Sequence, residues 1–307
     1  CVHREPSDPR TGPTRPVLSP RRERLRMPAN PRRPHRPPGA STPDARTVAE
    51  AVARAWHGTN RSAPPQIPLS TVAALALITP PPDQSSATAD LITGLDTEQF
   101  HGCMRTQWSI FVRARPDLLP AAWPLVQPWL GADPPDAATV AAARRVAHAA
   151  LDAGQLHLTG TLRRRDADLF GPLLVELRAD GARLVAGQIY TPGHIADILA
   201  AALMRGAAPG QPVIDPAVGT GGLFRAAAQT LRAQGTDPAS MLWIGGDIDD
   251  LAVACCAVNA ALWELGPNVV LGVGDTLTDS WQTTAIAQRR ESSRSPTSTV
   301  PPRSPPT

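Results

Sequence analysis

Three short apolar runs in the second half of the chain alternate with helical patterns. The runs lie in QPVIDPA, MLWIGGDID and NVVLGVGD, and the segments between them, GLFRAAAQTLRAQG and DLAVACCAVNAALWELG, have the composition of helices. Parallel strands need a crossover connection, usually a helix, and buried parallel strands read as continuous apolar runs. The order strand, helix, strand, helix, strand therefore predicts an α/β fold with a parallel sheet.

The chain before this pattern shows helical signals instead. DARTVAEAVARAWHG places Asp44 at an N-cap position and Gly58 at the stop, and TVAAARRVAHAALDAG predicts another helix that ends at Gly154. A helix in DADLFGPLLVELRADGARLV is expected to kink near Gly171–Pro172. A further helix, halted by Pro116, should bury one apolar stripe, formed by Phe100, Met104, Trp108, Phe111 and Val112. We therefore expect an N-terminal helical domain.

The two ends of the chain differ in composition from the rest. Many of the 35 prolines lie there, alternating with arginine in residues 1–43 and with serine and arginine in residues 282–307. Segments without a hydrophobic period cannot bury enough apolar surface to offset their ordering entropy, so both are predicted to be disordered. The basic arm at the N-terminus suits a nucleic-acid backbone, and a leader sequence without a role in the fold explains it equally well.

Targeting signals are not evident in the sequence. There is no continuous apolar run of about 18 residues, and the N-terminal region lacks the apolar core of a signal peptide. These features predict no membrane span and a cytoplasmic location. The four cysteines show no metal-ligand spacing, so we expect the Cys255–Cys256 pair to pack in the core.

A glycine-rich loop, VIDPAVGTGGLF, follows the first predicted strand. In parallel sheets ligands bind beyond the carboxyl ends of the strands, and glycines let backbone N–H groups approach them. A P-loop is excluded because the sequence contains no lysine. A dinucleotide fingerprint fits in part, since Gly219 and Gly221 have the right spacing but no glycine stands at the third position of the pattern. The third alternative is a nucleoside ligand without a phosphate, such as S-adenosylmethionine.

An aspartate closes each of the three predicted strands. Asp215 is suited to meet the ammonium group of such a ligand, and Asp247 can accept two hydrogen bonds from a ribose diol. Asp275 is placed to accept from an adenine amino group. Because the carboxyl ends of parallel strands share one edge, we expect these three carboxylates to converge on one site.

Four motifs resemble, in order, the cofactor-binding motifs of N6-adenine DNA methyltransferases: GQIYTPGHIADILA, VIDPAVGTGGLF, GGDIDDLAVACCAVNAALWELG and GVGDTL. The similarity is to the modification subunits of type I restriction systems and to stand-alone N-6 DNA methylases, and it covers about Asp166 to Leu277. It implies a partial Rossmann-like sheet (strands one to three), S-adenosyl-L-methionine as cofactor, and adenine-containing duplex DNA as a partner. One departure is Val218, where relatives often carry cysteine.

The resemblance also implies a set of cofactor-binding residues. Tyr190, the only tyrosine in the chain, has a structural alternative as a buried ring before a helix. The full set follows the motifs in order: Gln188, Tyr190, Thr191, Pro192, Asp215, Pro216, Ala217, Gly219, Thr220, Gly221, Gly222, Asp247, Ile248 and Asp275.

The catalytic motif of this family, [D/N]-P-P-[Y/F], is absent from the sequence. ADPPDA at Ala132 lies among predicted helices and lacks the aromatic residue. We expect a chain truncated before that motif, with a frameshift near Ser280, and with a specificity subunit or the missing C-terminal half as further partners. The alternatives are a non-catalytic DNA-associated or cofactor-binding remnant and a separate polypeptide that supplies the missing strands.

These interpretations divide the sequence into four parts. We expect a disordered arm over residues 1–43, a helical domain over 44–180, a partial methyltransferase domain over 181–281, and a disordered tail over 282–307.

Overall fold

The computed structural model describes residues 44–58, 64–178, 191–277 and 280–294. All of the described residues belong to one compact unit. The domain boundary predicted between residues 180 and 181 falls outside the described residues, so it stays a prediction.

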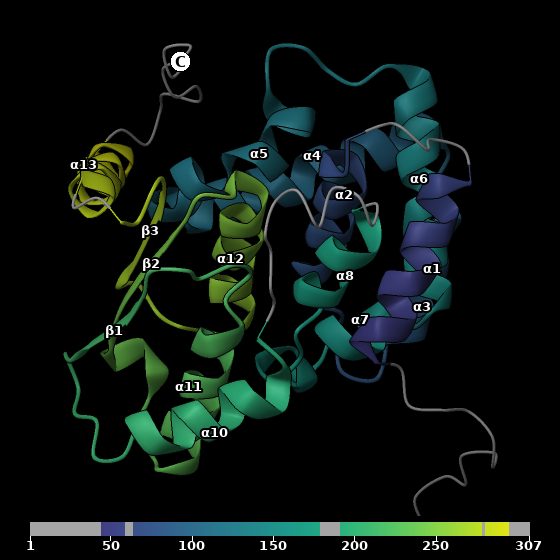
Figure 1. The fold of residues 1–307 in the computed structure, drawn as a ribbon. Coiled ribbons are helices and arrows are strands. Elements are labelled where there is room, and N and C mark those ends of the chain that lie inside the picture. The colour runs from purple at the N-terminus through teal and green to yellow at the C-terminus, as the bar shows by residue number, and fades with distance from the viewer. Residues whose placement is uncertain (1–43, 59–63, 179–190, 278–279, 295–307) are drawn as a thin grey trace, which may run out of the picture. The chain divides into compact units, whose positions relative to one another are not determined.

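The first part of the described chain is helical (Figure 1). Its elements are α1 (Ala45–His57), α2 (Gln66–Ala76), α3 (Ser85–Thr93), α4 (Thr97–Ala114), η1 (Pro116–Leu118), α5 (Leu119–Leu130), α6 (Ala137–Asp152), α7 (Gln155–Thr159), η2 (Leu162–Arg165) and α8 (Phe170–Leu177).

Capping residues account for where several of these helices begin. Asp44 accepts a hydrogen bond from the backbone N–H of Thr47 (2.7 Å) at the start of α1. Asp96 and Gln99 form a reciprocal capping box at the start of α4. The predicted N-cap of α1 is confirmed, as is the apolar stripe of α4, of which only Val112 is partly exposed.

Helix α8 corrects one prediction. We expected a helix kinked near Gly171–Pro172, but α8 begins at Phe170. Pro172 therefore lies in the first turn, where its missing N–H would have no intrahelical partner in any case. The Gly171 N–H donates instead to Asp168 Oδ1 (3.0 Å).

Three parallel strands form a sheet in the order β1-β2-β3, which confirms the predicted strand–helix alternation. In this register Asp215 lies beside Gly245, and Asp247 beside Val273. The elements of this part are α10 (Gly193–Leu203), β1 (Pro212–Asp215), α11 (Gly222–Ala233), η3 (Pro238–Ser240), β2 (Leu242–Asp247), α12 (Asp250–Leu262), β3 (Val269–Val273) and α13 (Ser280–Arg294).

Different helices cover the two faces of the sheet. On one face Trp243 packs against Phe224 of α11, with ring centroids 5.1 Å apart. On the other, a side chain at Gly246 or Gly272 would collide with Trp281 of α13. The bare backbone at these two glycines makes room for α13 on the sheet.

Helix α13 also corrects the predicted tail. Composition predicted disorder from residue 282, whereas α13 continues to Arg294. Trp281 and Ala285 are buried on the sheet, while most of the polar residues that follow are exposed. Two buried apolar side chains therefore anchor a helix whose other side chains are mostly exposed, and the average composition of the segment did not indicate them.

Helix α12 lies between the sheet and the preceding helices (Figure 1). It contacts β2 and β3 on one side and α2, α5 and α8 on the other. Ten of its residues are buried, including Cys255 and Cys256, as predicted for that pair. Among the described residues, no helix is both long enough and apolar enough to cross a bilayer.

Candidate functional site

A cavity of about 710 Å³ opens at the carboxyl ends of β1 and β2. Nine of the predicted cofactor-binding residues line it: Thr191, Pro192, Asp215, Ala217, Gly219, Thr220, Gly222, Asp247 and Ile248. Pro216, Gly221 and Asp275 do not line it. Gln188 and Tyr190 lie outside the described residues.

The glycine loop is held in place by α12. Gly219 and Gly221 have φ angles of 53° and 94°, a region that favours glycine. A Cβ atom at Gly221 would lie 2.9 Å from the ring of Trp263 and 3.0 Å from Cys256 Sγ. The buried Asn259 Nδ2 donates to the carbonyl of Thr220 (2.8 Å). Gly221 therefore allows the loop to pack on α12, whereas its neighbours line the cavity.

Asp215 is a buried carboxylate in the lining, with 7% of its surface exposed. Its Oδ1 accepts from the Ala217 N–H (3.0 Å), and its Oδ2 is buried with no hydrogen-bond partner among the described residues. Burial raises its pKa most, the Ala217 bond lowers it, and the charge of Asp247 raises it further. An unpaired buried acceptor of this kind favours a ligand that brings a donor or a positive charge.

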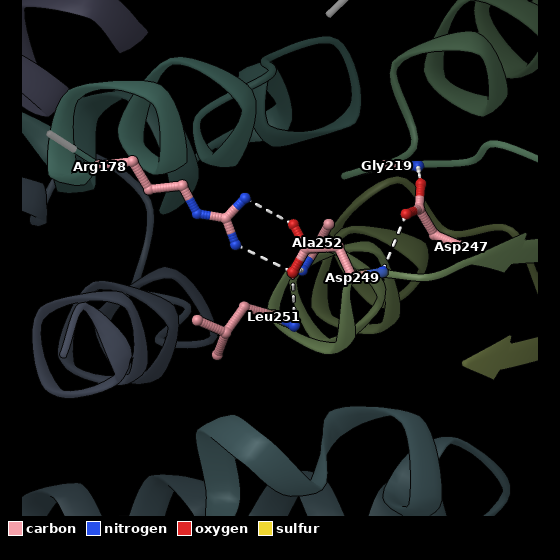
Figure 2. A network of polar contacts seen from close by, with 6 residues as sticks. All are labelled: Arg178, Gly219, Asp247, Asp249, Leu251 and Ala252. Carbon is pink, nitrogen blue, oxygen red and sulfur yellow. Dashed lines mark hydrogen bonds and ion pairs between the residues drawn. The ribbon is translucent and has the colours of Figure 1, made fainter. Parts of the chain in front are cut away.

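Asp247 connects two loops (Figure 2). Its Oδ2 accepts from the N–H of Gly219 (2.8 Å), in the loop after β1. Its Oδ1 accepts from the N–H of Asp249 (3.0 Å), in the turn between β2 and α12. A carboxylate has about four lone-pair positions, so both oxygens retain capacity for further donors.

Asp275 follows β3 at the same edge of the sheet but outside the cavity lining. Its Oδ1 accepts from the N–H of Leu277 (3.0 Å), and its side chain is exposed. The structure thus brings Asp215 and Asp247 together without placing Asp275 beside them. A role for Asp275 stays a prediction.

A second wall of the cavity, formed by α8 and the residues beside it, was not predicted from the sequence. Gly171, Pro172, Val175 and Glu176 of α8 lie in the lining together with Asp168. Burial is the main cause that raises the pKa of Asp168. The sequence of this segment contains no binding motif. The only indication was that the similarity to N6-adenine DNA methyltransferases begins at about Asp166.

One residue remote in sequence completes this second wall, and another supports it from outside the lining. Arg46 of α1 reaches the lining, and no local signal marks it. Trp263 Nε1 donates to the carbonyl of Ala167 (2.9 Å), which ties the segment before α8 to the end of α12. Asp249 also lies in the lining, and it accepts two bonds from Arg178, the residue that follows α8.

Within the described ranges, no group of three or more His, Cys, Asp or Glu side chains has a geometry that could hold a metal ion. The residues that line the cavity offer carboxylates, the guanidinium of Arg46 and the hydroxyl groups of Thr191 and Thr220.

The match of the sequence to known families coincides with this site. Residues 167–292 match the N-6 DNA methylase family. The match confirms the resemblance seen in the four motifs, and it runs from the wall before α8 into α13. This N-6 DNA methylase segment contains the glycine loop, the four aspartates of the cavity lining and the described three-stranded sheet. The family implies a methyltransferase that acts on DNA. A comparison with curated proteins gives no match.

Proposed function

We propose that the cavity binds S-adenosyl-L-methionine and that the chain is part of an N6-adenine DNA methyltransferase of the restriction-modification type, acting in the cytoplasm. The observation that carries this proposal is the meeting of Asp215, Asp247 and the glycine loop at one cavity within the N-6 DNA methylase segment.

The residues present fit this ligand. A volume of about 710 Å³ lies in the range common for small-molecule sites. The unpaired Oδ2 of Asp215 suits the ligand's ammonium group, and the free acceptor capacity of Asp247 suits its ribose hydroxyls. Ile248, which is 76% exposed, offers an apolar surface beside Asp247 for the adenine ring.

When bound, S-adenosylmethionine supplies a methyl group activated on its sulfonium. The chain's own residues bind and orient: Asp215 at the amino-acid end, Asp247 at the ribose, and the loop of Gly219 and Thr220 between them. Asp275, which lies outside the cavity lining, is proposed to accept a hydrogen bond from the adenine amino group at the edge of the site.

Transfer to adenine needs residues that this sequence does not contain. The target base must be flipped out of the duplex and stacked in a pocket, and its amino group must be polarised by hydrogen-bond acceptors. The family performs this with [D/N]-P-P-[Y/F], which is absent from the 307 residues. We therefore propose that a further polypeptide segment supplies this motif and that a specificity subunit selects the DNA sequence.

The edge of the sheet supports a need for further strands. In the described sheet β1 pairs with β2 alone, and Ile214 at its centre is 53% exposed. An open edge with an apolar side chain is normally paired or covered in a stable protein.

Calorimetric titration with S-adenosylmethionine tests the binding proposal. We expect the wild-type chain to bind and Asp247→Asn to bind about 100-fold more weakly, because the amide loses charge and acceptor capacity toward the ribose. Asp237→Asn is the matched control, since Asp237 caps η3 outside the cavity lining. Asp275→Asn decides whether the site extends to the third strand.

A methyl-transfer assay on adenine-containing duplex tests the rest of the proposal. We expect cofactor binding without transfer by this chain alone, and transfer when a polypeptide that carries [D/N]-P-P-[Y/F] is added. Transfer by the chain alone would contradict our account of the missing motif. Failure of the wild type to bind S-adenosylmethionine would favour a remnant without a cofactor.

A further inference from the structure

We propose that Arg178 is a positioning residue for the ligand cavity, acting through Asp249 to hold Asp247 and the glycine loop in place. The inference rests on the proposed function, because it assigns a role in cofactor binding to Arg178 through its bonds to Asp249.

The first link is a two-point ion pair. Arg178 Nη1 donates to Asp249 Oδ2 (2.6 Å), and Arg178 Nη2 donates to Asp249 Oδ1 (2.9 Å). The side chains are 14% and 8% exposed, so the pair is shielded from water. The paired geometry of a guanidinium with a carboxylate fixes orientation as well as distance, and the shielding strengthens it.

The second link is the turn that begins α12. Asp249 is the N-cap of this helix, and its Oδ1 accepts from the N–H groups of Leu251 (3.1 Å) and Ala252 (3.3 Å). A carboxylate held by Arg178 on one side and by the helix on the other fixes the backbone of Asp249. Figure 2 shows the guanidinium and the helix start meeting at this carboxylate.

The third link reaches the loop that follows β1. The N–H of Asp249 donates to Asp247 Oδ1, and Asp247 Oδ2 accepts from the N–H of Gly219. A single chain of hydrogen bonds thus runs from Arg178 to the glycine loop, and it passes through the carboxylate proposed to bind the ribose (Figure 2).

The positive charge of Arg178 is a second reason to expect that its removal disturbs the cavity. Asp168, Glu176, Asp215, Asp247 and Asp249 all contribute carboxylates to the cavity lining. Removing one partner of a shielded ion pair is destabilising, and here the remaining carboxylate lies among other carboxylates of the lining. Without Arg178 we expect the Asp249 turn to shift toward water, which would move the N–H that orients Asp247.

The test compares two arginines with similar ion pairs. Arg115 binds Asp117 through two bonds (3.0 and 2.9 Å), with the side chains 18% and 13% exposed, but this pair lies outside the ligand cavity. Arg178→Met and Arg115→Met should therefore lower the melting temperature by comparable amounts. We expect only Arg178→Met to weaken S-adenosylmethionine binding, by about 10- to 100-fold, the range for losing a hydrogen bond to a charged group.

Two further variants separate positioning from simple loss of charge. Arg178→Lys keeps the charge but not the two-point geometry, so its affinity should fall between those of wild type and Arg178→Met. Asn is also a good N-cap, so Asp249→Asn keeps the start of α12. If Arg178 acts through Asp249, the Arg178→Met/Asp249→Asn double variant should bind no more weakly than Arg178→Met.

Hydrogen exchange in the ligand-free protein gives a readout that does not depend on binding. The amides of Gly219 and Asp249 should exchange faster in Arg178→Met and at the wild-type rate in Arg115→Met. Equal affinity and equal exchange in the two methionine variants would overturn the inference and leave the proposed function intact. If the wild type itself binds no S-adenosylmethionine, the proposed function is wrong, and a role for Arg178 in cofactor binding falls with it.

Discussion

Helices α2 and α10 have the same length, 11 residues, and both are rich in apolar side chains, yet their surroundings differ sharply. Nine residues of α2 are buried. In α10 only Ala196 and Ala200 are buried, and the larger apolar side chains Ile195, Ile198, Leu199 and Leu203 are exposed.

The difference lies in the partners of the two helices. Helix α2 is enclosed by α4, α5, α6 and α12, whereas the principal described neighbour of α10 is α11. Apolar content thus indicates how much surface a helix can bury, but neighbouring elements decide how much it does bury. The ligand cavity lies in the less enclosed part of the molecule, where Thr191 and Pro192 at the start of α10 contribute to its lining.

Matched leucine truncations give the largest expected contrast between the two helices. Leu69 of α2 is fully buried, and Leu203 of α10 is 72% exposed. We expect Leu69→Ala to lower the free energy of unfolding by about 2–5 kcal/mol, through lost burial and a residual cavity. Leu203→Ala should change it by less than about 0.5 kcal/mol. Urea unfolding of both variants measures the difference.

Similar losses in the two variants would mean that α10 is covered in solution by something the described residues do not provide. Size-exclusion chromatography of the wild type at several concentrations would then show whether a second copy covers it.

Substitutions at two adjacent glycines in the loop after β1 should differ by an intermediate amount in their effect on the free energy of unfolding. Gly221 has a φ of 94° and would place a Cβ against Trp263 and Cys256, whereas nothing lies within 4 Å of a Cβ at Gly222. We expect Gly221→Ala to cost about 2 kcal/mol of unfolding free energy, from the left-handed backbone and overpacking. Gly222→Ala should remain within about 0.5 kcal/mol of wild type. Thermal unfolding of the two variants would show the contrast, and equal melting temperatures would contradict the packing of the loop on α12.

The smallest expected effect is a pH dependence due to Asp215. Because its pKa is raised in the folded protein, the folded state retains this proton to a higher pH than the unfolded chain does. The free energy of unfolding should therefore fall as pH rises from the ordinary value near 3.8 through the raised pKa. Asp215→Asn should lack this fall, since the amide does not titrate.

The measurement is the difference in unfolding free energy between wild type and Asp215→Asn across that pH range. A difference that stays constant with pH would show that the folded protein does not hold Asp215 in a desolvating site. The matched control is Asp237→Asn, because Asp237 caps η3 outside the ligand cavity.

Local rules predicted much of this fold. The strands and helices around Asp215 and Asp247 follow from short apolar runs and their spacing, and the ends of α1 follow from Asp44 and Gly58. The meeting of Asp215 and Asp247 could also be predicted, because parallel strands end at a common edge.

What the sequence did not reveal depends on tertiary contacts. The wall formed by α8 and Arg46 comes from segments distant from the motifs, and the bonds of Arg178 to Asp249 span 71 positions. The position of helix α13 depends on the packing of Trp281 and Ala285 over two glycines of the sheet, Gly246 in β2 and Gly272 in β3. Periodicity within one segment carries no information about such pairings.

The bonds of Asp247 have a consequence for ligand selectivity. Both of its oxygens are oriented by backbone N–H groups before any ligand arrives, so this acceptor is preorganised and little ordering entropy remains to be lost on binding. Because Asp247 also holds these two turns, a substitution of Asp247 that changed ligand specificity would loosen both turns as well. A substitution of the neighbouring Ile248 could change the specificity of the proposed site without breaking these bonds.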